Sequence, residues 1–84
     1  MQNCYVKTNG YVFMYSGAVD RSQVLASGNI FDCPYNVLYI SDNVTITTPS
    51  LALLNNTVVN STRTIVRNKG TDPIAVTDVN NSKI

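Results

Sequence analysis

Few residues in this sequence could carry chemistry, and aspartates supply all of its carboxylates. The 84 residues contain no histidine and no glutamate, so the usual general base near neutral pH and the commonest metal ligand are both absent. Asp42 and Asp72 are expected in turns, where an aspartate bonds its own backbone. No Ser-x-x-Lys pair, phosphate-binding glycine loop or Asp-x-Asp calcium spacing occurs. We therefore expect a protein that is not an enzyme and that binds no metal or cofactor.

Cys4 and Cys33 are the two thiols of the chain. Without histidine they do not make an ordinary four-ligand zinc site. A disulfide between them would close a long loop, which is worth roughly 3–4 kcal/mol in the chain-entropy treatment. Two small buried hydrophobic residues are the alternative. Because the first residues lack the basic and apolar stretches of a secretory signal, we favour free thiols.

The composition favours β-structure. The hydrophobic fraction is 44% and the charged fraction 13%, whereas disorder requires low hydrophobicity and high net charge. Threonine and valine suit strands, and the many asparagines and serines suit turns. The net charge is +1, and only Arg63, Arg67 and Lys69 lie close together. This is too little basic charge for a nucleic-acid-binding surface, so we expect no nucleic-acid partner.

The length permits one domain, residues 1–84, with a loose tail at residues 80–84. The longest apolar runs, residues 11–15 and 51–54, are far shorter than the roughly 20 residues of a membrane span. With no signal segment either, we expect cytoplasmic synthesis and no membrane partner. A chain this short buries a thin core, so stabilisation by self-association or a partner is expected.

The strongest local signal is Asn9-Gly10, which lies between two apolar stretches. Asn-Gly favours a two-residue hairpin turn because both turn positions need positive φ. Residues 4–15 would then form a hairpin with Val6 opposite Phe13.

Asp42-Asn43 predicts a second turn, in a hairpin over residues 37–48. In total we expect six or seven short strands with tight hairpins and at most one short helical turn. Regular turn spacing of this kind predicts an all-β fold, a small β-sandwich or barrel. No internal repeat is evident.

Residues Thr64–Val79 resemble a hairpin of bacterial immunoglobulin-like domains. They read TIVRNKGTDPIAVTDV, which is a strand, an Asn-x-Gly-Thr turn beginning at Asn68, and a second strand. The resemblance implies the edge of a sandwich and nothing about activity. The Cys–Trp–Cys framework of such domains is absent, since the chain has no tryptophan.

The first hairpin also gives the sharpest hypothesis about function, because both of its faces are mainly apolar. A two-residue turn would place Tyr5, Lys7, Val12 and Met14 on the face away from the core. Either the chain's own irregular segments cover this face, or another subunit does. Tyrosine and methionine are enriched at protein interfaces, and Lys7 would lie at the rim.

These observations favour a structural assembly protein that acts through protein–protein contacts, as a homo-oligomer or on a larger particle. A weakly charged β chain with no site chemistry is typical of small viral or phage virion subunits of the capsid cement or decoration type. The alternative is a β-sandwich module for ligand or carbohydrate binding or for adhesion. Tyrosines would then supply stacking surfaces, and the candidate loop residues are Asp42, Asn43, Asn68, Lys69 and Asp72.

Overall fold

A computed structural model describes residues 1–16, 18–19, 23–42, 45–46, 50–69 and 76–84, and all regular elements in these residues are β-strands. The strands have two to five residues each. In chain order they are β1 (Tyr5–Lys7), β2 (Phe13–Tyr15), β3 (Ala18–Val19), β4 (Gln23–Ser27), β5 (Ile30–Asp32), β6 (Leu38–Ile40), β7 (Thr45–Ile46), β8 (Ser50–Leu54), β9 (Thr57–Val59), β10 (Val66–Asn68), β11 (Val76–Val79) and β12 (Ser82–Lys83).

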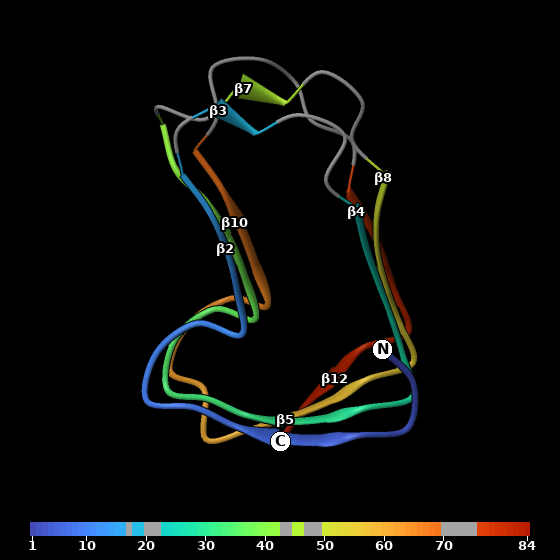
Figure 1. The fold of residues 1–84 in the computed structure, drawn as a ribbon. Helices are drawn as coiled ribbons and strands as arrows, with labels where there is room; N and C mark the ends of the chain where they lie inside the picture. The colour runs from blue at the N-terminus through green and yellow to red at the C-terminus, as the bar shows by residue number, and fades with distance from the viewer. Residues whose placement is uncertain (17, 20–22, 43–44, 47–49, 70–75) are drawn as a thin grey trace.

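Every pairing between the described strands is parallel, and each strand pairs with its counterpart one coil further along the chain. One sheet has the order β1-β5-β9-β12, the second β10-β6-β2 and the third β11-β8-β4, and β3 pairs with β7. Figure 1 looks along the stack, with these four sheets at the bottom, left, right and top of the coil. The chain is therefore a short parallel β-solenoid, in which each coil contacts only its neighbours.

The all-β class expected from the sequence is confirmed, but the expected hairpins are wrong. Strand β1 pairs with β5 and strand β2 with β6, both in parallel, so residues 4–15 do not pair with each other. Among the described residues, neither Asn9 nor Gly10 has a positive φ; they lie where the chain passes from one sheet to the next. Strand β6 likewise pairs in parallel, with β2 and β10. We expected a sandwich or barrel from the sequence, and that expectation did not include strands that stack in parallel from one coil to the next.

Two expectations for the C-terminal half are also corrected. Strands β10 and β11, which both lie within the immunoglobulin-like resemblance, belong to different sheets and do not form a hairpin. Residues 70–75 between them lie outside the described part of the chain. Residues 80–84 are not a loose tail, because β12 pairs with β9 and the Ile84 amide donates to the Val58 carbonyl at 2.9 Å.

A left-handed residue marks the same corner in successive coils. Asn3, Gly28, Asn55 and Asn80 have φ values of 52°, 68°, 56° and 57°, and each directly precedes the residue that leads into a bottom-sheet strand.

 
Asparagine and glycine tolerate this conformation better than other residues do. The sequence therefore does contain an internal repeat, a Gly-Asn or Asn-Asn pair in each of the later coils, and the expectation of no repeat is wrong.

A ladder of asparagine side chains joins the coils at this corner. The Asn29 Oδ1 accepts a hydrogen bond from the Cys4 amide, the Asn56 Oδ1 accepts one from the Asn29 amide, and the Asn81 Oδ1 accepts one from the Asn56 amide. Each of these bonds is 2.9 Å long, and they join residues that are 25, 27 and 25 positions apart in the sequence. Asn29 Nδ2 donates to Asn56 Oδ1 at 3.0 Å, and Asn56 Nδ2 to Asn81 Oδ1 at 2.8 Å. The Nδ2 atoms of Asn29, Asn56 and Asn81 also donate back to carbonyls one coil earlier, those of Met1, Ala26 and Leu53 respectively.

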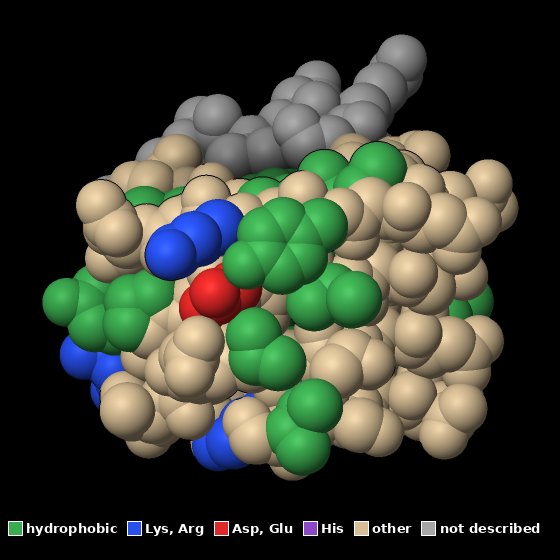
Figure 2. Space-filling model, turned by 90° about the horizontal axis from the view of Figure 1, so that it is seen from below, with side chains coloured by type: hydrophobic (Ala, Val, Ile, Leu, Met, Phe, Trp, Pro, Cys, Tyr) green, Lys and Arg blue, Asp and Glu red, His purple; other side chains and the backbone are tan. Residues whose placement is uncertain are grey.

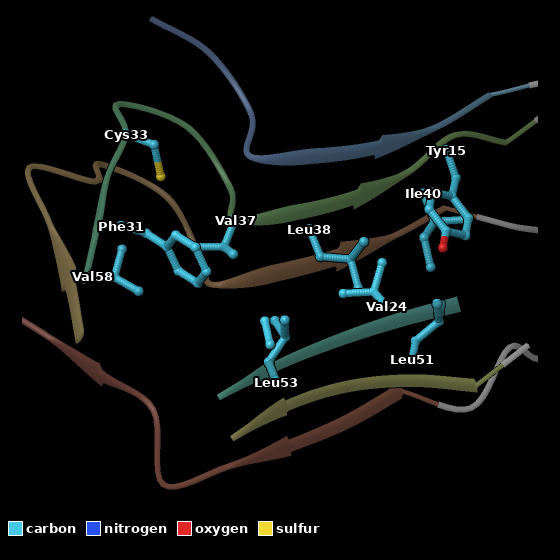
Figure 3. Packing of buried hydrophobic residues seen from close by; sticks show 11 residues of the cluster. Tyr15, Val24, Phe31, Cys33, Val37, Leu38, Ile40, Leu51, Leu53 and Val58 are labelled. Carbon is cyan, nitrogen blue, oxygen red and sulfur yellow. The ribbon is translucent and has the colours of Figure 1, made fainter. Parts of the chain in front are cut away.

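The core is the apolar interior of the stack. Figure 3 shows Leu38 of β6 facing Val24 and Leu53 of the opposite sheet, and all three are buried. Inward residues of the second coil are almost fully enclosed, because a coil lies on each side of them. The enclosed set includes Phe31, Cys33, Val37, Leu38, Ile40, Leu51 and Leu53.

Substitution by alanine should affect Gly28 and Gly10 differently. At Gly28, with φ of 68°, a Cβ would come within 2.5 Å of the Asn3 Oδ1, so Gly28→Ala should destabilise the fold by about 1–2 kcal/mol through left-handed strain. At Gly10 a Cβ would meet only Tyr35 at 3.8 Å, so Gly10→Ala should stay within about 0.5 kcal/mol of wild type. Urea denaturation measures both, and equal losses would contradict this account.

Removal of one ladder side chain should be costly. Asn56→Ala leaves the Asn29 amide and the Ala26 carbonyl without their partners inside the stack, and we expect a loss of at least about 2 kcal/mol in the free energy of unfolding. Asn9 is exposed, so Asn9→Ala serves as the matched control and should change little. A small effect of Asn56→Ala in urea denaturation would show that the ladder does not support the coils.

Candidate functional site

The structure separates the four residues that the sequence assigned to one interface. Tyr5 and Lys7 are exposed on β1, with Tyr5 62% accessible. Met14 is 56% accessible but belongs to β2, which lies in another sheet. Val12 packs partly buried against the core. The expected shared face was wrong because it depended on an antiparallel pairing that does not form.

The candidate loop residues are partly brought together. The register places Asn68 beside Ile40, and the Lys69 amide donates to the Ile40 carbonyl at 2.8 Å. Asp42, Asn68 and Lys69 are all exposed near this end of the left-hand sheet. Asn43 and Asp72 lie outside the described residues, so this group of candidates is described only in part.

The outer face of the bottom sheet carries a small polar network beside apolar side chains. The Tyr5 hydroxyl donates to Asp32 Oδ2 at 3.1 Å, and Asn60 Nδ2 donates to Asp32 Oδ1 at 2.8 Å. The hydrogen bond from Asn60, then that from Tyr5 and the charge of Lys7, lower the pKa of Asp32 despite some desolvation. Ile30, 44% accessible, lies beside Tyr5 in the register. Figure 2 shows this face, with acidic, basic and hydrophobic side chains next to one another.

A cluster of aromatic rings occupies the corner between the bottom and left-hand sheets. Tyr11 stacks on Tyr39 with ring centroids 4.7 Å apart, and its ring is tilted against Tyr35 at 5.3 Å. The Arg63 guanidinium lies 4.2 Å from the Tyr35 ring centroid, a cation–π contact. Arg63 Nη1 also donates to the Tyr11 hydroxyl at 3.4 Å. The sequence analysis expected tyrosines to supply stacking surfaces, but it did not place Arg63 beside them.

The two ends of the stack form a third kind of surface. Among the residues that the structure describes, six hydrophobic ones are only partly buried against the core, and these six belong to the terminal coils. They are Val6, Val12 and Phe13 at the N-terminal end, and Ile65, Val66 and Val76 at the C-terminal end.

Neither a pocket nor a group of three or more potential metal ligands is found in the described part of the chain. Cys4 is exposed, Cys33 is buried and neither is bonded to the other. Burial raises the pKa of the Cys33 thiol, which makes it a weak nucleophile.

Comparisons with protein-family models, with curated proteins and with solved structures return no match. Among the described residues, no helix is long and apolar enough to cross a membrane.

The two thiols should differ in reactivity. Cys4 is exposed and should react readily with a thiol reagent such as DTNB, whereas Cys33 should react only after the protein opens. We expect one readily accessible thiol in the native protein, none in Cys4→Ser, and two under denaturing, non-reducing conditions. A native wild-type protein with two accessible thiols would contradict the burial of Cys33, and a denatured protein with none would indicate a disulfide.

Proposed function

We propose that this chain is a non-catalytic structural module that works by protein–protein assembly through an end of its β-solenoid. The observation that carries the proposal is the partial exposure of the core at the terminal coils. In a solenoid each coil buries its apolar interior against the next coil. A terminal coil that keeps apolar inward residues therefore leaves surface that another protein can cover.

Along one column of stacked residues, the side chain at the N-terminal end is less buried than those in the inner coils. Val6, Phe31 and Val58 follow one another in register through three coils. Phe31 and Val58 are 0% and 1% accessible, whereas Val6 at the end of the column is only partly buried. Contact with a partner at this end would bury Val6 as the internal coils bury Phe31.

The backbone of the terminal strands supports the same proposal. Strand β1 is held to β5 through the Cys4 carbonyl and the Thr8 amide, at 2.9 and 3.0 Å. Because successive residues of a strand point their amides to opposite sides, Tyr5 and Lys7 direct theirs toward the open edge. Such an edge is a template for a further strand.

The partner that fits is protein, either another copy of this chain or the subunits of a larger particle. The most concrete setting is a viral or phage virion, in which small subunits without enzymatic activity attach to a shell. Low charge, the absence of histidine and glutamate, and exposed apolar ends support this setting over nucleic-acid or membrane binding.

A ligand-binding or adhesion module is the second candidate, and the aromatic corner favours it. Tyr35 is 38% accessible, and Arg63 holds donors beside it. Aromatic faces with adjacent donors suit carbohydrate or another planar polar ligand. In this function the protein would remain a monomer, and no partner protein would cover the aromatic corner.

Sedimentation tests the assembly proposal. We expect the purified protein to form species heavier than the 9.2 kDa chain as its concentration increases, because apolar ends and open strand edges associate by mass action. Analytical ultracentrifugation over two orders of magnitude in concentration measures this. A sedimenting mass of 9.2 kDa at every concentration would contradict self-assembly and favour the binding module.

A further inference from the structure

Asn9-Gly10 forms no hairpin turn, but the pair carries a reactive combination of groups. It is the only Asn-Gly pair in the sequence. The backbone nitrogen that follows an asparagine can attack the carbon of the side-chain amide, which closes a succinimide ring. Glycine at the following position favours the attack because it has no side chain to obstruct the approach. Asparagine is for this reason among the thermolabile residues of proteins.

The loop around Asn9 leaves the reacting groups accessible. Asn9 is exposed, and in the described part of the chain no hydrogen bond holds its side-chain amide. The Gly10 amide, which supplies the attacking nitrogen, donates to the Thr8 hydroxyl at 2.8 Å. This bond lies within one loop and does not join two coils. A single side-chain hydrogen bond therefore restrains the nitrogen.

Stacking of the coils protects most of the other asparagines. The Thr57 amide, which follows Asn56, donates to the Asn29 carbonyl of the preceding coil at 2.8 Å. The Asn56 amide, which follows Asn55, donates to Asn81 Oδ1 at 2.9 Å. Amides bound to another coil also follow five further asparagines, Asn3, Asn29, Asn36, Asn68 and Asn81. Attack by any of these nitrogens requires that neighbouring coils first separate.

From this difference we infer that Asn9 is a site of spontaneous deamidation in the folded protein, a modification independent of the proposed assembly function. The Gly10 nitrogen gives up its proton to the solvent and forms a bond to Asn9 Cγ. The side-chain nitrogen takes up a proton and leaves as ammonia. Water then opens the succinimide at either carbonyl, which leaves aspartate or isoaspartate at position 9.

The product changes both the charge and the backbone of this loop. A carboxylate replaces a neutral amide, so the formal net charge falls by one unit, from +1 to zero. Isoaspartate also adds one carbon to the main chain between β1 and β2. Position 10 borders the Tyr35 ring, on which the Arg63 guanidinium stacks. The new carboxylate therefore arises next to the aromatic corner.

Peptide mapping by mass spectrometry tests the inference on the whole chain. The native protein is incubated at mildly alkaline pH, and deamidation is followed at each asparagine. We expect Asn9 to react first, and its rate to rise with pH because the attacking nitrogen must lose its proton.

A second incubation in guanidinium chloride removes the intrinsic effect of the following residue from the comparison. For Asn9 the unfolded chain should react roughly two- to tenfold faster than the native protein, because only one hydrogen bond of modest net strength is lost. For Asn55 this ratio should be larger by at least about tenfold, because in the folded protein the following amide is released only when coils separate.

Two variants of the loop separate the reaction from the stability of the fold. Thr8→Val removes the hydroxyl that holds the Gly10 amide, so deamidation of the native protein at Asn9 should accelerate roughly two- to tenfold. Gly10→Ala should slow it at least about tenfold, because the methyl group obstructs the attack, although the surroundings of Gly10 accommodate a Cβ. Circular dichroism checks that both variants are folded.

The outcomes distinguish a reactive loop from a general effect of unfolding. Early modification of Asn9 in the native protein, with less protection than Asn55 and with suppression by Gly10→Ala, supports the inference. Equal protection of Asn9 and Asn55 overturns it, and so does a native protein that stays unmodified at Asn9 while the unfolded chain reacts there. Neither result depends on whether the protein assembles, which ultracentrifugation measures separately.

Discussion

The asparagine ladder is the interaction on which the stacking of the coils depends. At the corner where the chain turns into a bottom-sheet strand, the backbone changes direction and its amides lose their regular partners. The side chains of Asn29, Asn56 and Asn81 supply oxygens to the amides of the preceding coil. Buried polar groups without partners are costly, so the ladder fixes both the position of the corner and the spacing between coils. The left-handed residue before each asparagine makes the turn sharp enough for this alignment.

Once the corner is fixed, the parallel register places like residues above one another. Val6, Phe31 and Val58 form one inward column, and Leu38 stacks between Phe13 and Val66 in another. This stacking explains why a short chain has a dry core in its middle and a half-exposed core at its ends. Outward side chains do not have to fit into such a column. The polar network of Asp32 and the aromatic cluster around Tyr35 lie at outward positions.

The strands and their class could be predicted from composition and alternation, because alternation has the same period in parallel and antiparallel sheets. The partners of the strands could not, since Asn9-Gly10 indicated a local hairpin and outweighed pairings that lie a whole coil away in the sequence. The repeated pairs Gly28-Asn29 and Asn55-Asn56 were the signal that could have revealed the winding. Tyr5 is exposed, whereas Val12, which was expected on the same outer face, packs against the core because its expected orientation depended on the hairpin.

Arg63 and Tyr11 illustrate why the surfaces are harder to predict than the strands. They are 52 residues apart and meet only because the winding brings the first and third coils to one corner. Other polar contacts of the last strands span very different distances along the chain. Lys83 Nζ donates to the Arg63 carbonyl, 20 residues away, whereas Asn81 Nδ2 donates to Asp78 Oδ1, three residues away. The first contact depends on the winding and the second on a local turn, so the order of polar residues along the sequence predicts neither without the coil period.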